Sequence, residues 1–164
     1  AINAEPHDWL QTIALSQTVK ATLVPARHWS ARGLLDRNKA LWAGFVLETP
    51  AGTIYVAGDT GYGDGRHFRS VREHFGAPKL AVLPIGAYEP RWFMKNMHMN
   101  PEEAVRALQD CGAEQALAYH FGTFQLAEEA IGAPRAALAA ALKATNIAPE
   151  KFRALDPGQF WEIV

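Results

Sequence analysis

The sequence predicts a layered α/β fold formed by a single domain, residues 1–164. Short runs of apolar or β-branched residues recur along the chain and are bounded by Gly and Pro. Longer segments with apolar residues at helical spacing lie between those runs. Strands that alternate with helices are typical of α/β layer architectures. A chain of 164 residues with a 49% hydrophobic share suits one globular domain of ordinary size.

Strands are predicted wherever an apolar run lies between turn residues. The runs at 41–49 and 53–57 are separated only by Pro50-Ala51-Gly52, which predicts a β-hairpin. The full set of predicted strands is 9–13, 19–25, 41–49, 53–57, 79–85, 116–119 and 160–164.

Helices are predicted over residues 65–75, 100–111 and 134–144, with a further helical turn at 124–130. The second helix has the clearest start, because Asn100 can cap it, Pro101 suits its first position and Glu103 can bond back to the cap. Cys111 falls on its apolar side, so we expect a buried cysteine. A single cysteine excludes an intrachain disulfide and a Cys-rich zinc finger.

Charge and hydropathy exclude some classes of partner. A net charge of -1 gives no bulk electrostatic case for nucleic acid binding. No apolar run approaches the roughly 18 residues that span a bilayer. The sequence lacks an initiator Met and a signal pattern, so we expect it to begin inside a longer gene product.

Three groups that can bind a metal each follow a predicted strand. They are His28, Asp59 and His120, with Asp59 in the motif Gly58-Asp59-Thr60-Gly61. Sites in layered α/β folds gather at the carboxyl ends of strands. Two imidazoles and one carboxylate suit Zn²⁺ or a similar divalent ion. The alternatives are a carboxylate that accepts bonds from its own turn amides and histidines with structural or surface roles.

A second candidate group surrounds His98, just before the capped helix. Arg91, Lys95 and Tyr88 precede it. One interpretation is an anion-binding rim, in which Arg91 and Lys95 meet a phosphate and His98 steadies a developing oxyanion. The other is a solvated loop with aromatic packing. We assign no role to His7, or to His67 and His74, which fall on a helix predicted to lie at the surface.

Several longer stretches resemble one enzyme family. The resemblance is to the N-acyl phosphatidylethanolamine-hydrolysing phospholipase D group of the metallo-β-lactamase superfamily, in its C-terminal half. It extends from about residue 22 to the end, and residues 84–94 are its most specific part. The stretches that carry it are 27–29, 38–42, 58–61, 84–94, 98–104 and 120–124.

This resemblance implies half of a four-layer αββα sandwich, a mixed sheet with helices on one face. It implies a dizinc hydrolase site, in which His28 binds one zinc, Asp59 bridges both and His120 binds the other. Asp59 and His98 would be the catalytic residues, and Arg91, Lys95 and Tyr88 would contact substrate. The substrate class would be N-acylated phospholipids or related phosphodiesters. Alternatives are a lactonase of sugar-phosphate lactones and a non-enzymatic scaffold.

One expected motif of the superfamily, His-x-His-x-Asp-His, occurs nowhere in the sequence. We therefore expect an incomplete enzyme half that binds zinc weakly, does not turn over alone, and forms a symmetric homodimer through its uncovered sheet face. The expected location is cytoplasmic. Peripheral membrane contact is an alternative, through the patch Trp92, Phe93, Met94, Met97 and Met99, which core packing would explain as well.

Overall fold

The computed structural model describes residues 5–163, whose strands form one seven-stranded sheet in sequence order. The strands are β1 (Thr12–Ala14), β2 (Lys20–Pro25), β3 (Ala43–Thr49), β4 (Gly52–Val56), β5 (Leu80–Pro84), β6 (Gln115–Tyr119) and β7 (Phe152–Arg153). The helices are α1 (Arg66–Phe75), α2 (Arg91–Met94), α3 (Pro101–Cys111) and α4 (Ala133–Ala144), with a 3₁₀ turn η1 (Pro149–Lys151).

The sheet is mixed. Strands β1 to β4 pair antiparallel, and β4 to β7 pair parallel. The predicted hairpin is confirmed by the pairing of Thr49 with Gly52 between β3 and β4. Parallel neighbours need a crossover connection, and α1 and α3 provide it between β4 and β5 and between β5 and β6.

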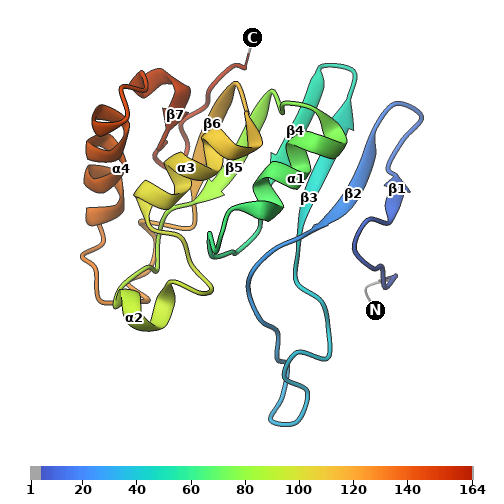
Figure 1. Cartoon of the computed structure of the whole chain (residues 1–164), viewed down its shortest axis with the longest axis horizontal. Coiled ribbons are helices and arrows are strands. Elements are labelled where there is room, and N and C mark those ends of the chain that lie inside the picture. The colour runs from blue at the N-terminus through green and yellow to red at the C-terminus, as the bar shows by residue number, and fades with distance from the viewer. Residues whose placement is uncertain (1–4, 164) are drawn as a thin grey trace.

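The helices cover one face of the sheet, as expected. Figure 1 shows α1 and α3 across that face, with α4 beside α3. The side chains beneath them are fully buried, including Val46, Tyr55, Leu83 and Ala116. Alternate residues of each strand point to this core, because successive side chains in a strand face opposite sides.

The opposite face carries a row of only partly covered apolar side chains. Leu23, Phe45, Val56, Val82 and Leu117 are register partners across five adjacent strands. Phe45 is exposed and the other four are half-buried. An apolar row that crosses a whole sheet marks a surface suited to a further layer.

Two sequence predictions near the C-terminus are wrong. Residues 124–130 form an irregular loop instead of a helical turn. The last strand is β7 at Phe152–Arg153, and no strand forms over 160–163; residue 164 of that prediction lies outside the described residues. The tail instead crosses the sheet, where Ile163 lies beside Ile54 and Leu80. Ile163 therefore lies beside the sheet instead of pairing at its edge, whereas Phe160 is 92% exposed.

Helix α3 begins as the sequence predicts. The Asn100 side chain accepts a hydrogen bond from Glu103 N–H at 2.9 Å, and the Glu103 carboxylate accepts one from Asn100 N–H at 3.1 Å. Cys111 is buried, as expected. The short helix α2 is absent from the predicted helices, because its four residues are too few to show helical periodicity.

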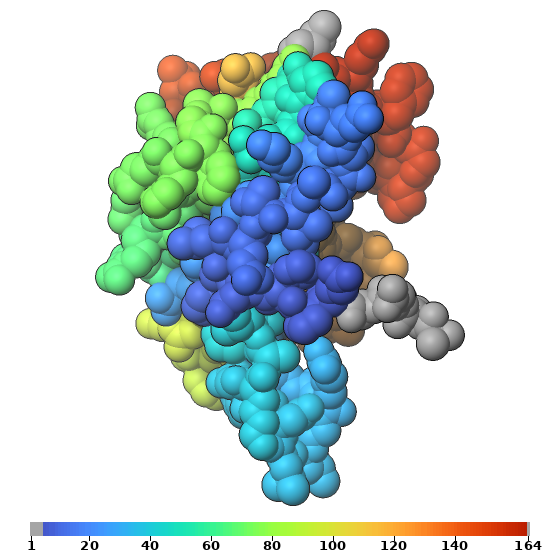
Figure 2. Space-filling model, turned by 90° about the vertical axis from the view of Figure 1, so that its right-hand side faces the viewer, coloured from blue at the N-terminus to red at the C-terminus, as the bar shows by residue number. Residues whose placement is uncertain are grey.

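The connection between β2 and β3 projects beyond the end of the sheet (Figures 1 and 2). Its base is fixed by two indoles. Trp9 Nε1–H donates to the Trp42 carbonyl at 2.8 Å, and Trp42 Nε1–H donates to the Ala26 carbonyl at 3.1 Å. Among residues 5–163, no helix has both the length and the apolar character that crossing a membrane requires.

Candidate metal centre

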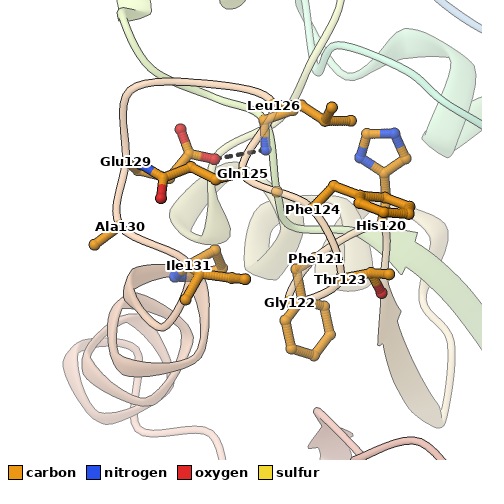
Figure 3. Close-up of a pocket in the computed structure, with 13 residues that line it drawn as sticks. His120, Phe121, Gly122, Thr123, Phe124, Gln125, Leu126, Glu129, Ala130 and Ile131 are labelled. Carbon is orange, nitrogen blue, oxygen red and sulfur yellow. Dashed lines mark hydrogen bonds between the residues drawn. The ribbon is translucent and has the colours of Figure 1, made fainter.

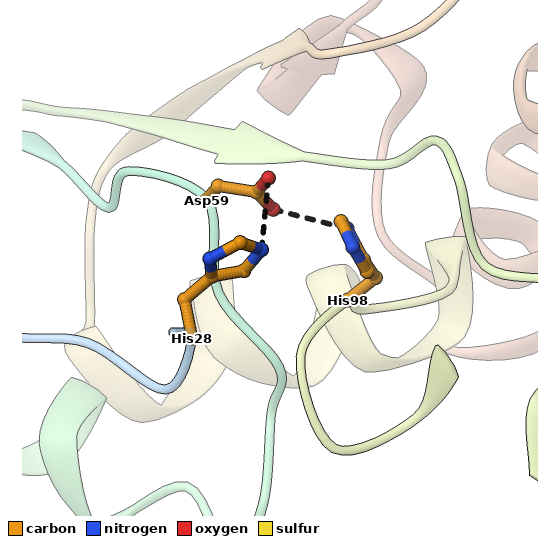
Figure 4. A group of neighbouring side chains, drawn as sticks. All are labelled: His28, Asp59 and His98. Carbon is orange, nitrogen blue, oxygen red and sulfur yellow. Dashed lines mark ion pairs between the residues drawn. The ribbon is translucent and has the colours of Figure 1, made fainter. Parts of the chain in front are cut away.

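Four side chains from distant parts of the chain meet at the carboxyl end of the parallel strands. His28 follows β2, Asp59 follows β4 and His120 follows β6, as the sequence predicts. His98 reaches the same point from the loop before α3. Figure 4 shows His28 and His98 directed at the Asp59 carboxylate.

All three imidazoles contact one carboxylate. His28 Nε2 lies 3.2 Å and His120 Nε2 lies 3.3 Å from Asp59 Oδ2, and His98 Nδ1 lies 3.0 Å from Asp59 Oδ1. The His98 ring centroid is 5.2 Å from that of His28 and 5.7 Å from that of His120. The three predicted metal ligands are therefore brought together, and His98 joins them.

The tightest grouping differs from the predicted ligand trio. Donor atoms of His28, Asp59 and His98 all lie within 4.8 Å of one another. The resemblance gave His98 a catalytic role and His120 a metal-binding role, yet here both imidazoles face the same carboxylate. The position of His98 thus suits either a ligand or a group beside the reacting atoms.

The arrangement of these donor atoms suits a bound cation better than it suits hydrogen bonds among the side chains themselves. His28 Nε2, His98 Nδ1 and Asp59 Oδ1 are buried, and none has a hydrogen-bond partner among the described residues despite the short separations. Buried polar atoms are almost always satisfied. Neutral imidazole nitrogens and a carboxylate oxygen are the ligands that Zn²⁺ and similar ions take.

Charge at the site is set by Asp59. Burial alone would raise its pKa, but contacts with His120, His28 and His98 outweigh burial and hold the pKa of this carboxyl well below its usual range. In return, the Asp59 carboxylate raises the pKa of His28 and that of His120 against the opposing effect of burial. The carboxylate is therefore ionised at neutral pH.

The His28 ring is held in one orientation. Its Nδ1 lies 3.0 Å from the Trp29 carbonyl oxygen, so Nδ1–H donates there and Nε2 is left to face Asp59. Metal-binding histidines commonly donate their second ring N–H to a carbonyl or carboxylate. The Trp29 indole also stacks against the imidazole at 5.9 Å between ring centroids.

Thr60 links the loops that carry His28 and His98. Its Oγ1 accepts from Arg27 N–H at 2.8 Å, and its carbonyl accepts from Met99 N–H at 3.1 Å. The side chain is fully buried. The sequence interpretation gave Thr60 no role, although its place after Asp59 in the Gly-Asp-Thr-Gly motif was a signal that could have suggested one.

Two glycines let these loops approach closely. A Cβ at Gly61 would lie 2.6 Å from the Asn96 carbonyl oxygen, on the loop that leads to His98. A Cβ at Gly86 would lie 2.1 Å from the carbonyl oxygen of His120. Backbone approaches this tight tolerate no side chain, so both histidines depend on a glycine in a neighbouring loop.

The structure does not place Arg91, Lys95 and Tyr88 as an open anion-binding rim. Arg91 Nη1–H donates to the carbonyls of Tyr88 (3.2 Å) and His98 (3.1 Å), and Nη2–H donates to Glu103 at 2.7 Å. Its guanidinium is thus engaged within the protein and holds the His98 loop to α3. Tyr88 is buried, and Lys95 is exposed.

His67 does not lie at the surface, as the sequence interpretation expected. It is only 7% exposed, and its Nε2 lies 3.4 Å from Thr60 Oγ1. Burial lowers its pKa to about 4. The helical periodicity did not reveal this position, because His67 lies beside the apolar stripe of α1. It is buried against Thr60, at the end of the sheet that carries the candidate metal centre.

The proposed membrane patch is divided between surface and core. Trp92 and Phe93 are exposed on α2, whereas Met99 is completely buried. Core packing therefore explains Met99, whereas Trp92 and Phe93 are available to an external surface and Met94 and Met97 are half-buried.

Comparison with known proteins identifies relatives over most of the chain. A family described as "Beta-lactamase superfamily domain" matches residues 1–121. The chain is 37% identical over 148 residues to N-acyl-phosphatidylethanolamine-hydrolyzing phospholipase D 1 of Caenorhabditis elegans, covering 89% of this chain and 41% of that protein. It is 40% identical over 126 residues to the mitochondrial N-acyl-phosphatidylethanolamine-hydrolyzing phospholipase D of Saccharomyces cerevisiae, covering 74% of this chain and 27% of that protein.

Solved structures share the fold. An isothiocyanate hydrolase from Delia radicum gut bacteria matches with a TM-score of 0.69 at 20% identity, covering 90% of this chain and 55% of that one. The chain spans less than half the length of the two phospholipases and just over half of this structure.

Proposed function

Because the chain belongs to the metallo-β-lactamase superfamily, we propose that it supplies the His/Asp part of a metal-dependent hydrolase site. The observation that carries the proposal is the convergence of three imidazoles on one ionised carboxylate. We propose zinc as the metal, with His28, Asp59 and His120 as ligands. Such an ion lowers the pKa of bound water so that hydroxide is available near neutral pH.

The substrate class we propose is the phosphodiester of N-acylated phospholipids. Support comes from the two phospholipases D with 37% and 40% identity. The residues of this chain have defined parts. Asp59 remains anionic, Trp29 fixes the His28 tautomer, and His98 lies where its ring could donate to charge that develops on a phosphoryl oxygen. Lys95 remains the candidate contact for the phosphate itself.

We infer that the active enzyme is a longer protein. With three ligands and Asp59 shared, neither of two metals has the three protein ligands that catalytic zinc sites use. The chain also spans only 41% and 27% of the two phospholipases. The chain alone should therefore bind zinc more weakly than micromolar and should not turn over.

The test compares this chain with the longer gene product that carries it. Both would be assayed for release of phosphatidic acid from N-acyl phosphatidylethanolamine and for opening of a sugar-phosphate lactone. The proposal expects diester cleavage by the longer protein only. Faster lactone opening would reassign the substrate, and full activity after Asp59→Ala would show that the histidine cluster is a scaffold.

A homodimer through the uncovered sheet face is also proposed for the chain by itself. The row from Leu23 to Leu117 is continuous and apolar enough to pack on a second copy. Sedimentation should show a dimer at micromolar concentration, and Phe45→Glu should shift it to monomer. A folded monomer at that concentration would contradict this interface.

A further inference from the structure

A separate cavity opens beside His120, on the side away from β2. It has a volume of about 170 Å³ and lies between the loop after β5 and the long loop that connects β6 to α4. Figure 3 shows Phe121, Phe124 and Ile131 around this space, with the His120 imidazole at its edge. The cavity therefore adjoins the candidate metal centre, and His120 belongs to both.

The mouth of the cavity is apolar and open to solvent. Phe124 is 74% exposed, Leu126 73% and Ile131 50%. Large apolar side chains that gather at one exposed opening mark a binding surface. Their position around a cavity next to His120 points to an apolar ligand that enters from the site.

The one carboxylate in the cavity wall is already satisfied. Glu129 Oε1 accepts from Ala87 N–H at 2.7 Å and from Tyr88 N–H at 3.3 Å, and its Oε2 accepts from Glu89 N–H at 3.0 Å. A carboxylate with three backbone donors has little capacity left for a cationic ligand. Glu129 instead fastens the two loops together and so fixes the shape of the cavity.

The Phe121 side of the cavity is also held in place by a neighbouring side chain. The Arg135 guanidinium lies 5.4 Å from the centroid of the Phe121 ring and donates to the Ala154 carbonyl and to Asp156. The cavity is therefore a built feature of the fold, with its two loops tied together by Glu129 and Phe121 braced by Arg135.

We propose that this cavity is a subsite for a short apolar substituent of the substrate, next to the bond that is cleaved. An apolar cavity of about 150 Å³ holds one benzene molecule. The present cavity therefore has room for roughly six carbon atoms, so a longer chain would extend past Phe124 and Leu126 into solvent. This inference rests on the proposed function, because it places the reacting group at His120.

Calorimetry with alkyl phosphonates of increasing chain length tests the subsite, with zinc in excess. Affinity should rise at least about tenfold from methyl to hexyl, because each buried methylene adds favourable transfer energy, and should level off from hexyl to dodecyl. Ile131→Trp should remove this gain by filling the cavity, and Phe124→Ala should reduce it by removing a wall. Leu34→Trp, a fully exposed position on the projecting connection, is the matched control.

Each outcome has a distinct meaning. Phosphonate binding with no dependence on chain length, or with a dependence that Ile131→Trp leaves intact, would overturn the subsite and leave the proposed function standing. If 1-hexanol binds as tightly as hexyl phosphonate, the subsite stands and the phosphodiester assignment fails. A gain that continues to dodecyl and changes equally in Leu34→Trp would indicate a general lipid surface and would also overturn the subsite.

Discussion

Histidines on the two sides of the Asp59–Thr60 turn have opposite acid–base behaviour. On one side, His28 and His120 face the Asp59 carboxylate, which raises the pKa of each. On the other side, burial, together with the nearby positive charge of Arg27, lowers the pKa of His67 to about 4. Position relative to one carboxylate therefore separates a candidate ligand from a structural histidine, although all three are largely buried.

The two regions are coupled through Thr60. Its hydroxyl meets His67 on one side and the backbone of Arg27 on the other. The metal centre is thus supported by a neutral hydrogen-bonded layer behind it. Experiments that remove the carboxylate, the buried imidazole or the hydroxyl should affect metal affinity and stability to different extents.

The largest effect is expected for Asp59→Asn. The change removes the negative charge that all three imidazoles face, so zinc affinity should fall at least about 100-fold. Loss of residues that only orient ligands costs roughly 10–100-fold. Zinc titration by calorimetry measures the effect. Asp36→Asn, at a partly exposed carboxylate on the projecting connection, is the control and should leave zinc affinity unchanged.

The second effect is a change of folding stability with pH, and it isolates the contribution of His67. Because its folded pKa is about 4 and its unfolded value is 6.5, the unfolded state binds more protons between those values, and stability falls as pH drops through that window. Relative to His67→Gln, the native protein should lose about 2 kcal/mol between pH 7.5 and pH 5. Urea unfolding at several pH values measures this difference.

The pH dependence contributed by His28 and His120 has the opposite sign to that of His67, so the native protein must be compared with His67→Gln. His28 and His120 have raised pKa values, so their contribution is present below 6.5 and is lost as pH rises through the folded pKa. Both proteins contain His28 and His120, so subtracting the stability–pH curve of His67→Gln from that of the native protein cancels their contribution. Equal pH slopes in the two proteins would contradict the buried, neutral state of His67.

A smaller effect is expected for Thr60→Val. The Arg27 amide would lose its acceptor in a buried setting, which costs about 1–2 kcal/mol of unfolding free energy. Zinc affinity should fall about tenfold as the His28 loop loosens. Thr18→Val, on the exposed β1–β2 turn, is the matched control for the loss of a hydroxyl.

The smallest effect is expected for Arg91→Lys. A lysine keeps the charge but cannot reach two carbonyls and Glu103 together, so stability should fall by about 1 kcal/mol. Affinity for inorganic phosphate should not change if Arg91 only positions the His98 loop. A clear loss of phosphate affinity in Arg91→Lys but not in Lys95→Gln would restore Arg91 to the substrate-binding rim.

The sequence predicted what depends on local pattern. Strand runs ending at His28, Asp59 and His120 placed these residues at one edge of the sheet, and the Asn100 cap predicted the start of α3. Contacts between distant loops left no such pattern. Glu129 binds amides some 40 residues away, and His67 is buried by the site end of the sheet, so neither could be read from spacing.

The most direct measurement is anomalous diffraction at the zinc edge from crystals of this chain soaked in millimolar zinc. The proposed centre predicts a peak about 2.0–2.2 Å from His28 Nε2 and from an Asp59 carboxylate oxygen, with a further contact from His98 or His120. A map with no peak there, and with the imidazoles still turned onto a bare carboxylate, would contradict the metal centre.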